Sequence, residues 1–177
     1  MSEYTVRWSR RSRHIRIRVA PGGGVFVTAP TLMSVALVEK FVEKQARWIE
    51  RAAERMSGYK SLPVSGRRDY LKHREEARGF LTERVAYWNK QYGFTYGRIA
   101  IKDTKRLWGS CSRKGNINFS YALLFLPREL ADYVVVHELC HLAELNHSKQ
   151  FWALVAQRLP EYVSLRRELR RYAPRMS

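Results

Sequence analysis

The sequence of 177 residues lacks long apolar runs. No stretch reaches the roughly eighteen consecutive apolar residues that a membrane-spanning helix needs. The first residues, Met1 to Trp8, also lack the apolar core of a secretory signal peptide, and arginines follow them. We therefore expect a cytoplasmic protein that has no membrane partner.

Cysteine is scarce, because Cys111 and Cys140 are the only two. Two cysteines cannot form the disulfide framework of a small secreted protein, so we expect free thiols that pack as small apolar side chains. A single long-range disulfide is the alternative, and nothing in the sequence favours it. The sequence also contains neither a P-loop nor a cluster of carboxylates of the kind that holds Mg²⁺ beside a nucleotide.

Acidic residues are outnumbered, with 16 Asp and Glu against 33 Lys and Arg, which gives a formal charge of +17. This charge favours anionic partners such as nucleic acid, nucleotides or acidic peptides. Six arginines and no acid lie between Arg7 and Arg18. Two interpretations of this run stay open: a solvated strand face that keeps the protein soluble, or a surface that binds an anion.

Apolar patterning predicts the secondary structure of the first part of the chain. Apolar residues alternate with arginine over 15–19, which is typical of a half-buried strand, and a turn at 21–24 leads into a returning strand at 25–27. Apolar residues at three-, four- and seven-residue steps then predict one amphipathic helix over 32–56. The segment 57–66 is the candidate linker.

The second part of the chain mixes helices with short strands. Pro127 favours the start of a helix that runs from Arg128 to about Leu145. The other predicted elements are a helix at 68–92, strands at 98–103, 107–112 and 116–121, of which the last two form a hairpin, and helices at 149–159 and 161–172.

The helix from Arg128 carries two histidines, His137 and His141, four residues apart. This spacing puts both imidazoles on one helix face, where both can reach one Zn²⁺ at about 2.0–2.1 Å. Glu138 lies on the flank of that face. In this His-Glu-x-x-His arrangement the glutamate is the general base that acts on a zinc-bound water.

A catalytic zinc has three protein ligands and one open position, and His147 is the candidate third ligand. Ten residues of straight helix rise about 15 Å, so the chain must turn back after His141. We expect the turn at Asn146, since asparagine tolerates the left-handed conformation. Glu144 is a candidate for a fourth ligand or for a residue that supports the ligands. Two alternatives are a structural zinc, with Cys140 as a further ligand, and a core helix with solvent-facing histidines.

Longer segments of the chain resemble the YgjP-like family of bacterial metal-dependent hydrolases, which is related to the SprT and WLM zinc metallopeptidases. The segments that carry the resemblance are Trp108–Ser112, Gly115–Asn118, Tyr133–His141, Asn146–Ser148 and Phe151–Trp152. One departure is Leu107, because an arginine commonly precedes the tryptophan in this family, and here Arg106 is displaced by one position.

The resemblance implies an α+β fold, a compact zincin-like domain over 1–177. In it a small β-sheet lies over the His-Glu-x-x-His helix, together with an N-terminal β-hairpin and flanking helices. We expect an N-terminal hairpin and helix part at 1–60 and a metal-binding part at 67–177.

The resemblance also implies which residues form the site: the ligands are His137, His141 and His147, and the catalytic acid/base is Glu138. It further suggests that Trp108 and Ser110 border the cleft, in a strand that pairs with an extended substrate. A purely structural role for these last two residues is the alternative.

Members of this family are described both as metallopeptidases and as nucleotide pyrophosphatases that act on UTP. The first prediction is therefore a zinc-dependent hydrolase of metallopeptidase type with a peptide or protein substrate. A nucleoside triphosphate (UTP) pyrophosphatase at the same metal site is the first alternative, and the positive charge suits it. A nucleic-acid-associated basic protein is the second alternative, supported by charge alone.

Overall fold

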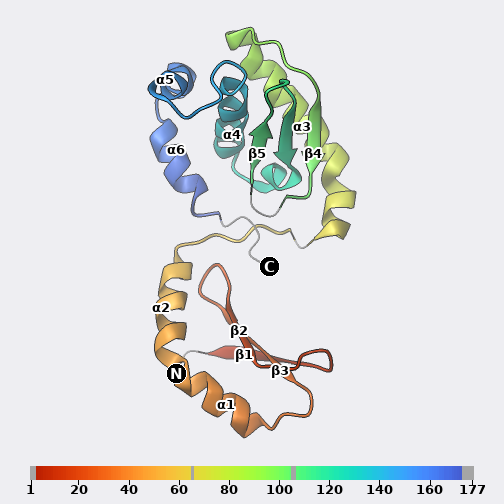
Figure 1. Ribbon diagram of the computed structural model, residues 1–177, viewed down its shortest axis with the longest axis vertical. Helices are drawn as coiled ribbons and strands as arrows, with labels where there is room; N and C mark the ends of the chain where they lie inside the picture. Colours follow the sequence, from red (N-terminus) through yellow and green to blue (C-terminus); the bar gives the residue numbers. More distant parts are fainter. Residues whose placement is uncertain (1–2, 65, 105–106, 173–177) are drawn as a thin grey trace. The chain divides into compact units, whose positions relative to one another are not determined.

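The computed structural model describes residues 3–64, 66–104 and 107–172 (Figure 1). Its contacts divide the chain into two compact units, Met1–Ser61 and Leu62–Ser177, each with its own sheet and its own apolar core. Helices and short mixed sheets make up the chain, so the α+β class predicted from the sequence is confirmed. Within the described ranges, none of the helices has the length and apolar character needed to cross a membrane.

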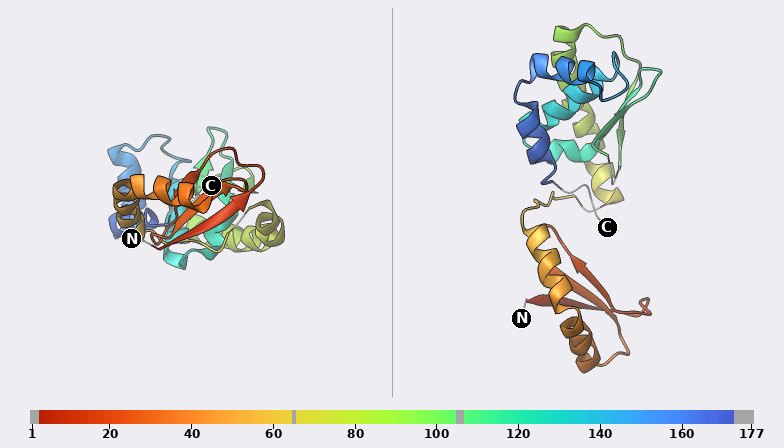
Figure 2. Two further views of the ribbon diagram at one scale, coloured as in Figure 1. Left: turned by 90° about the horizontal axis from the view of Figure 1, so that it is seen from below. Right: turned by 60° about the vertical axis from the view of Figure 1, so that its left-hand side comes forward.

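The N-terminal unit is a three-stranded sheet with two helices on one of its faces (Figure 2). Its elements are β1 (Tyr4–Ser9), β2 (Arg16–Val19), β3 (Val25–Pro30), α1 (Val35–Lys44) and α2 (Ala46–Ser57). The central strand β3 pairs antiparallel with β2, which confirms the predicted hairpin, and parallel with β1. Alternate residues of β3 are buried against α1 and α2, so the intervening residues lie on the opposite face of the sheet.

The single helix predicted over 32–56 is wrong, because α1 and α2 are separate helices. Gln45 between them has φ −97° and ψ 3°, and its backbone N–H donates to the carbonyls of Val42 and Glu43. This tight last turn ends α1 and lets the chain change direction. Val38 of α1 and Ile49 of α2 consequently pack into the same core.

The C-terminal unit places a three-stranded sheet beside a buried helix. Its elements are α3 (Arg67–Tyr92), β4 (Ile99–Lys102), β5 (Gly109–Cys111), β6 (Ile117–Ser120), the 3₁₀ helix η1 (Tyr121–Phe125), α4 (Arg128–Cys140), α5 (Lys149–Arg158) and α6 (Tyr162–Leu169). The strand order is β4-β6-β5, with β4 parallel and β5 antiparallel to β6. The predicted hairpin is confirmed as β5 and β6, and β5 is an edge strand.

Helix α4 is the centre of this unit, and all of its residues from Leu130 to Val136 are buried. It packs against α3 and β5 and against α5 and α6 (Figure 1). A helix that is apolar on nearly all sides belongs in a core. It ends at Cys140, earlier than predicted, and Pro127 is its N-cap rather than its first helical residue.

A buried ion pair joins α3 to α4. The Arg84 side chain donates from Nε and Nη2 to the two carboxylate oxygens of Asp132, at 2.6 and 2.9 Å. Both residues are buried. The predicted helix at 68–92 gives no reason to expect Arg84 in the core, because a charged residue is expected on the solvent side of an amphipathic helix.

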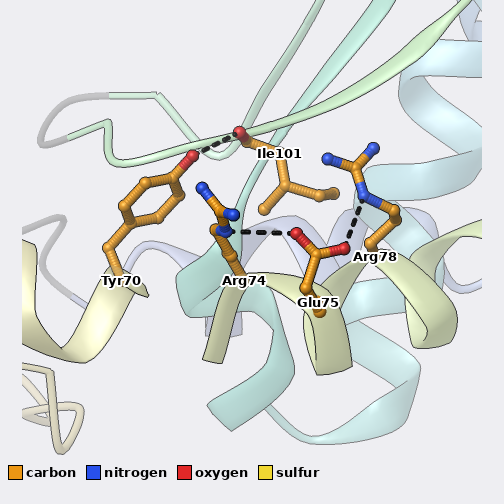
Figure 3. Close-up of polar contacts among 5 residues, drawn as sticks. All are labelled: Tyr70, Arg74, Glu75, Arg78 and Ile101. Carbon is orange, nitrogen blue, oxygen red and sulfur yellow. Dashed lines mark hydrogen bonds and ion pairs between the residues drawn. The ribbon is translucent and has the colours of Figure 1, made fainter. Parts of the chain in front are cut away.

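The first turns of α3 are attached to β4 and carry surface ion pairs (Figure 3). The Tyr70 hydroxyl donates to the carbonyl of Ile101 at 3.2 Å. Glu75 lies between Arg74 and Arg78, and each arginine Nε is 3.1 Å from one of its carboxylate oxygens. Exposed pairs of this kind contribute about 0.2–1 kcal/mol, so the Tyr70 contact and the buried core fix α3 more than these charges do.

Candidate metal centre

Three histidines converge at the end of α4. His137 lies in its last turn, His141 is its C-cap, and His147 precedes Ser148, the N-cap of α5. One ring nitrogen from each histidine can be chosen so that all three lie within 4.8 Å of one another. The Nε2 atoms of His137 and His147 are 3.0 Å apart. The structure thus brings together all three histidines that the sequence selects.

The turn that returns His147 to the helix is built without a left-handed residue. No non-glycine residue in the described ranges has a positive φ, so the left-handed turn predicted at Asn146 is wrong. Instead the chain continues past α4 in tight turns, in which the N–H of Glu144 donates to the carbonyl of Cys140 at 3.0 Å. Ser148 N–H then donates to the carbonyl of Asn146 at 2.8 Å.

Two neighbours hold the imidazoles in place. Nδ1 of His141 is 3.1 Å from the carbonyl oxygen of Glu144; a proton on Nδ1 leaves the lone pair on Nε2 available for a metal. The side chain of Glu144 is absent from the convergent group and accepts from the N–H of Asn146 instead. Buried Phe151 contacts the rings of all three histidines, at centroid distances of 4.5–4.9 Å.

The donor set fits a cation such as Zn²⁺. Two nitrogens at about 2.0–2.1 Å from one tetrahedral zinc lie roughly 3.3 Å apart, close to the 3.0 Å between His137 and His147. Burial lowers the pKa of His137 to about 3, and the charges of the other two histidines and Arg166 add to this effect. Partial burial, His141 and Arg166 also lower the pKa of His147. These shifts favour the neutral form of His137 and His147, which is the form that binds a metal.

Glu138 is buried between α4 and β5, with 4% of its surface exposed. Burial raises the pKa of its carboxyl group to about 8, and Oε2 has no hydrogen-bond partner within the described residues. A cation bound by the neighbouring histidines would favour the carboxylate and reverse this shift. A buried carboxyl group that lacks a hydrogen-bond partner within the described residues and lies beside three convergent histidines fits a general base.

Gly109 gives Glu138 the space that it occupies. A Cβ atom at Gly109 would lie 2.6 Å from Oε1 and 2.7 Å from Cγ of Glu138. We expect Gly109→Ala to displace the carboxylate and lower kcat about 100-fold, since a displacement of about 1 Å at a reacting group has an effect of this size. Bound metal should be unchanged. The measurement is turnover per bound metal.

Gly79→Ala is the matched control for Gly109→Ala, since nothing lies within 4 Å of a Cβ atom at Gly79. It should leave kcat as in the wild type. Wild-type turnover in Gly109→Ala would show that the position of the Glu138 carboxyl group does not control the reaction.

The two predicted cleft residues lie in and next to β5. Trp108 packs against the core of the unit, and its carbonyl accepts from the N–H of Ser120 at 2.8 Å. The Ser110 hydroxyl accepts from the side chain of Asn118 at 3.1 Å. By strand alternation Ser110 faces away from the side on which Gly109 meets Glu138. Arg106 lies outside the described residues.

Both cysteines are free thiols, as predicted. Cys140 is buried, and burial raises its pKa to about 11. Burial, followed by the charge of Glu138, raises the pKa of Cys111 to about 11 as well. Neither residue is in the convergent group, so both keep the neutral form of small apolar side chains.

Sequence reasoning misses Arg166, on α6. Its guanidinium carbon lies 4.9 Å from the ring centroid of Trp152, and that ring stacks on His147 at 5.5 Å. Its charge acts on both His137 and His147. Because arginine is abundant throughout the chain, no sequence pattern sets this one apart from the others.

The fold and the site define the class of this protein. An α+β unit whose buried helix carries His-Glu-x-x-His, with a third histidine beside the two, is the arrangement of a metal-dependent hydrolase. Residues 13–73 and 67–172 match the model of the YgjP-like metallopeptidase domain. The chain belongs to the YgjP-like family, and a metallopeptidase domain implies a bound metal.

Two archaeal proteins described as metallopeptidase zymogens are among the solved structures that match half of this chain. Abylysin of Pyrococcus abyssi is 24% identical with a TM-score of 0.47, over 50% of this chain and 90% of that chain. Jannalysin of Methanocaldococcus jannaschii is 19% identical with a TM-score of 0.45, over 50% of this chain and 92% of that chain. No significant match is found among curated proteins.

Proposed function

We propose that this protein is a zinc-dependent hydrolase of metallopeptidase type, with Glu138 as its general base. The observation that carries the proposal is the position of the Glu138 carboxyl group. It is buried and unpaired, it directly follows the first of three convergent histidines, and it lies against an edge strand. The donor set of His137, His141 and His147 suits Zn²⁺, because imidazole nitrogen is one of its preferred ligands.

The chain's own residues supply the proton chemistry. When bound, zinc would polarise the attacked carbonyl group and lower the pKa of a water molecule. Glu138 accepts the proton of the attacking water and returns it to the leaving amine. Its low-dielectric surroundings strengthen its electrostatic interaction with a neighbouring cation. Gly109 and the fixed end of α4 hold the carboxylate in the position that this transfer needs.

The substrate that we propose is an extended peptide bound along β5. Within the described part of the chain this strand pairs with β6 on one side only, so its other edge can add a further strand through main-chain hydrogen bonds. Gly109 in this strand lies against Glu138, so a peptide paired there runs past the general base. A nucleotide has no peptide backbone, so it cannot pair with this edge as a β-strand does.

We propose that Arg166 binds an acidic group of the substrate, because its guanidinium group lies over Trp152, whose ring stacks on His147. Replacing Arg166 with glutamine should raise KM about tenfold for a peptide with a carboxylate near the cleaved bond, because a hydrogen bond to a charged group contributes about 1.5–3 kcal/mol. kcat for a neutral peptide should stay unchanged. The measurement is KM and kcat for paired acidic and neutral peptides.

Arg167→Gln is the control for Arg166→Gln, since it removes the same charge from the next, exposed residue of α6. An equal loss in both variants would indicate a general effect of charge rather than a specific contact.

The test of the proposed function compares substrates on the zinc-loaded chain. We expect new amino termini from unfolded casein, no pyrophosphate from UTP, and loss of cleavage on chelation that added Zn²⁺ restores. Release of pyrophosphate from UTP without peptide cleavage would replace the proposal with the nucleotide pyrophosphatase. Cleavage that survives complete removal of metal would contradict the zinc mechanism.

A further inference from the structure

The outer face of the N-terminal sheet has no role in the proposed hydrolysis. One face of this sheet is buried under α1 and α2, and the opposite face carries the intervening residues of each strand. Register places Arg7, Thr28 and Arg16 in one row across the three strands. Thr5, Phe26 and Arg18 form the neighbouring row. We call these six residues the arginine face.

Most acidic residues of this unit lie on its helices, which also carry exposed lysines and arginines. No Asp or Glu occurs between residues 4 and 38, a segment that contains all three strands. The four glutamates that follow within the unit, Glu39, Glu43, Glu50 and Glu54, are exposed on α1 and α2. Arg7, Arg16 and Arg18 are exposed as well. With three arginines, and with Glu3 just before β1 as the nearest acid in the sequence, the arginine face carries a net positive charge and complements a polyanion.

An exposed aromatic ring lies within this positive surface. Phe26, on the central strand, is 40% exposed. A phenylalanine on a central strand would usually be buried in the core of the unit. The Arg18 guanidinium carbon lies 5.2 Å from its ring centroid. Gly24 lies beside the ring, since a Cβ atom added there would lie 3.4 Å from Cε2 of Phe26, in ordinary van der Waals contact. The face thus offers an aromatic ring and a guanidinium plane side by side.

We propose that the arginine face binds single-stranded nucleic acid. Arginines that follow the phosphate backbone, combined with an aromatic side chain on which a base stacks, are the two elements of sequence-independent recognition of single strands. A guanidinium group stacks on bases as well. Duplex DNA keeps its bases stacked inside the helix and can use only the arginines. This binding is independent of the metal centre, and it gives the hydrolase a means of staying near nucleic acid.

The test measures binding of the full chain to a fluorescein-labelled 15-nucleotide oligo(dT) by anisotropy. We expect the affinity to fall with salt, with a log–log slope of about −0.7 for each neutralised phosphate. Phe26→Ala should weaken binding about tenfold, since loss of one stacked base has an effect of this order. Phe26→Trp should restore it, which a merely structural role of Phe26 would not predict.

The control variants keep the loss of charge constant. Arg16→Gln with Arg18→Gln should weaken binding at least tenfold and reduce the salt slope by about 1.4, for two phosphate contacts. Arg47→Gln with Arg51→Gln removes the same charge from exposed positions of α2, on the other side of the sheet, and should have little effect. Equal losses in the two pairs would overturn the proposal.

Three further arms test the class of ligand. A duplex of equal length and inorganic polyphosphate should each bind more weakly than oligo(dT), because neither offers a base for stacking. Vesicles containing anionic phosphatidylserine should not compete with the oligonucleotide. Equal affinity for duplex or polyphosphate, or displacement by the vesicles, would show that the face binds by charge alone and would overturn the assignment to single strands.

Discussion

Replacing Glu138 with glutamine should remove hydrolysis and leave the bound metal in place. The amide has nearly the shape of the carboxyl group but cannot accept the proton of the attacking water. General acid–base catalysis contributes roughly 10²–10⁴-fold, so we expect turnover to fall by at least that factor. The convergent group consists of His137, His141 and His147 and does not include Glu138. One metal per chain should therefore remain bound in the variant. Initial rates and metal content of the same preparation measure both effects.

Glu144→Gln is the control for Glu138→Gln. Glu144 lies close by in the sequence, but its side chain is outside the group of convergent histidines. Its carbonyl, which contacts His141, is kept in the variant. We expect turnover within a few-fold of the wild type. Wild-type turnover in Glu138→Gln itself would contradict the assignment of the general base.

Removing Asp132 should strongly lower the stability of the folded protein. Asp132→Ala leaves the buried guanidinium of Arg84 without the carboxylate that it contacts twice. Breaking a buried pair by removing one partner lowers the free energy of unfolding by about 3–5 kcal/mol, because an uncompensated charge stays in the core. The pair joins α3 to α4, so the metal centre should loosen with it. Urea unfolding followed by circular dichroism measures the loss.

The double variant Arg84→Met with Asp132→Leu distinguishes the cost of an unpaired buried charge from the loss of the ion pair itself. Replacing both partners by apolar side chains of similar size removes the buried charge, so this variant should be more stable than Asp132→Ala. If Asp132→Ala unfolds at the same urea concentration as the wild type, the pair does not support α4.

Local sequence signals predict the histidine helix and the convergence of its histidines well. Val134 to Val136 place His137 at the end of a buried helix, and four-residue spacing fixes the relation of His137 to His141. These are short-range rules of helix geometry. Both hairpins are predicted equally well, because each turn is short and joins two strands that are adjacent in the sequence.

The parts that sequence reasoning misses depend on contacts between distant residues. Arg84 and Asp132 are 48 residues apart, and no local pattern indicates that they pair. The break at Gln45 has no proline or glycine to announce it and follows from packing on the sheet. The same holds for Gly109, whose contact with Glu138 exists only once β5 lies against α4. Tertiary packing overrides local propensity at such positions.

We propose that His137, His141 and His147 together hold one metal beside Glu138. The most direct test is a crystal of the zinc-loaded protein, with anomalous diffraction data collected above and below the zinc edge. We predict one anomalous peak per chain, at about 2.0–2.1 Å from a ring nitrogen of each of His137, His141 and His147. A peak bound to other residues, or no peak between the histidines of the zinc-loaded protein, would contradict it.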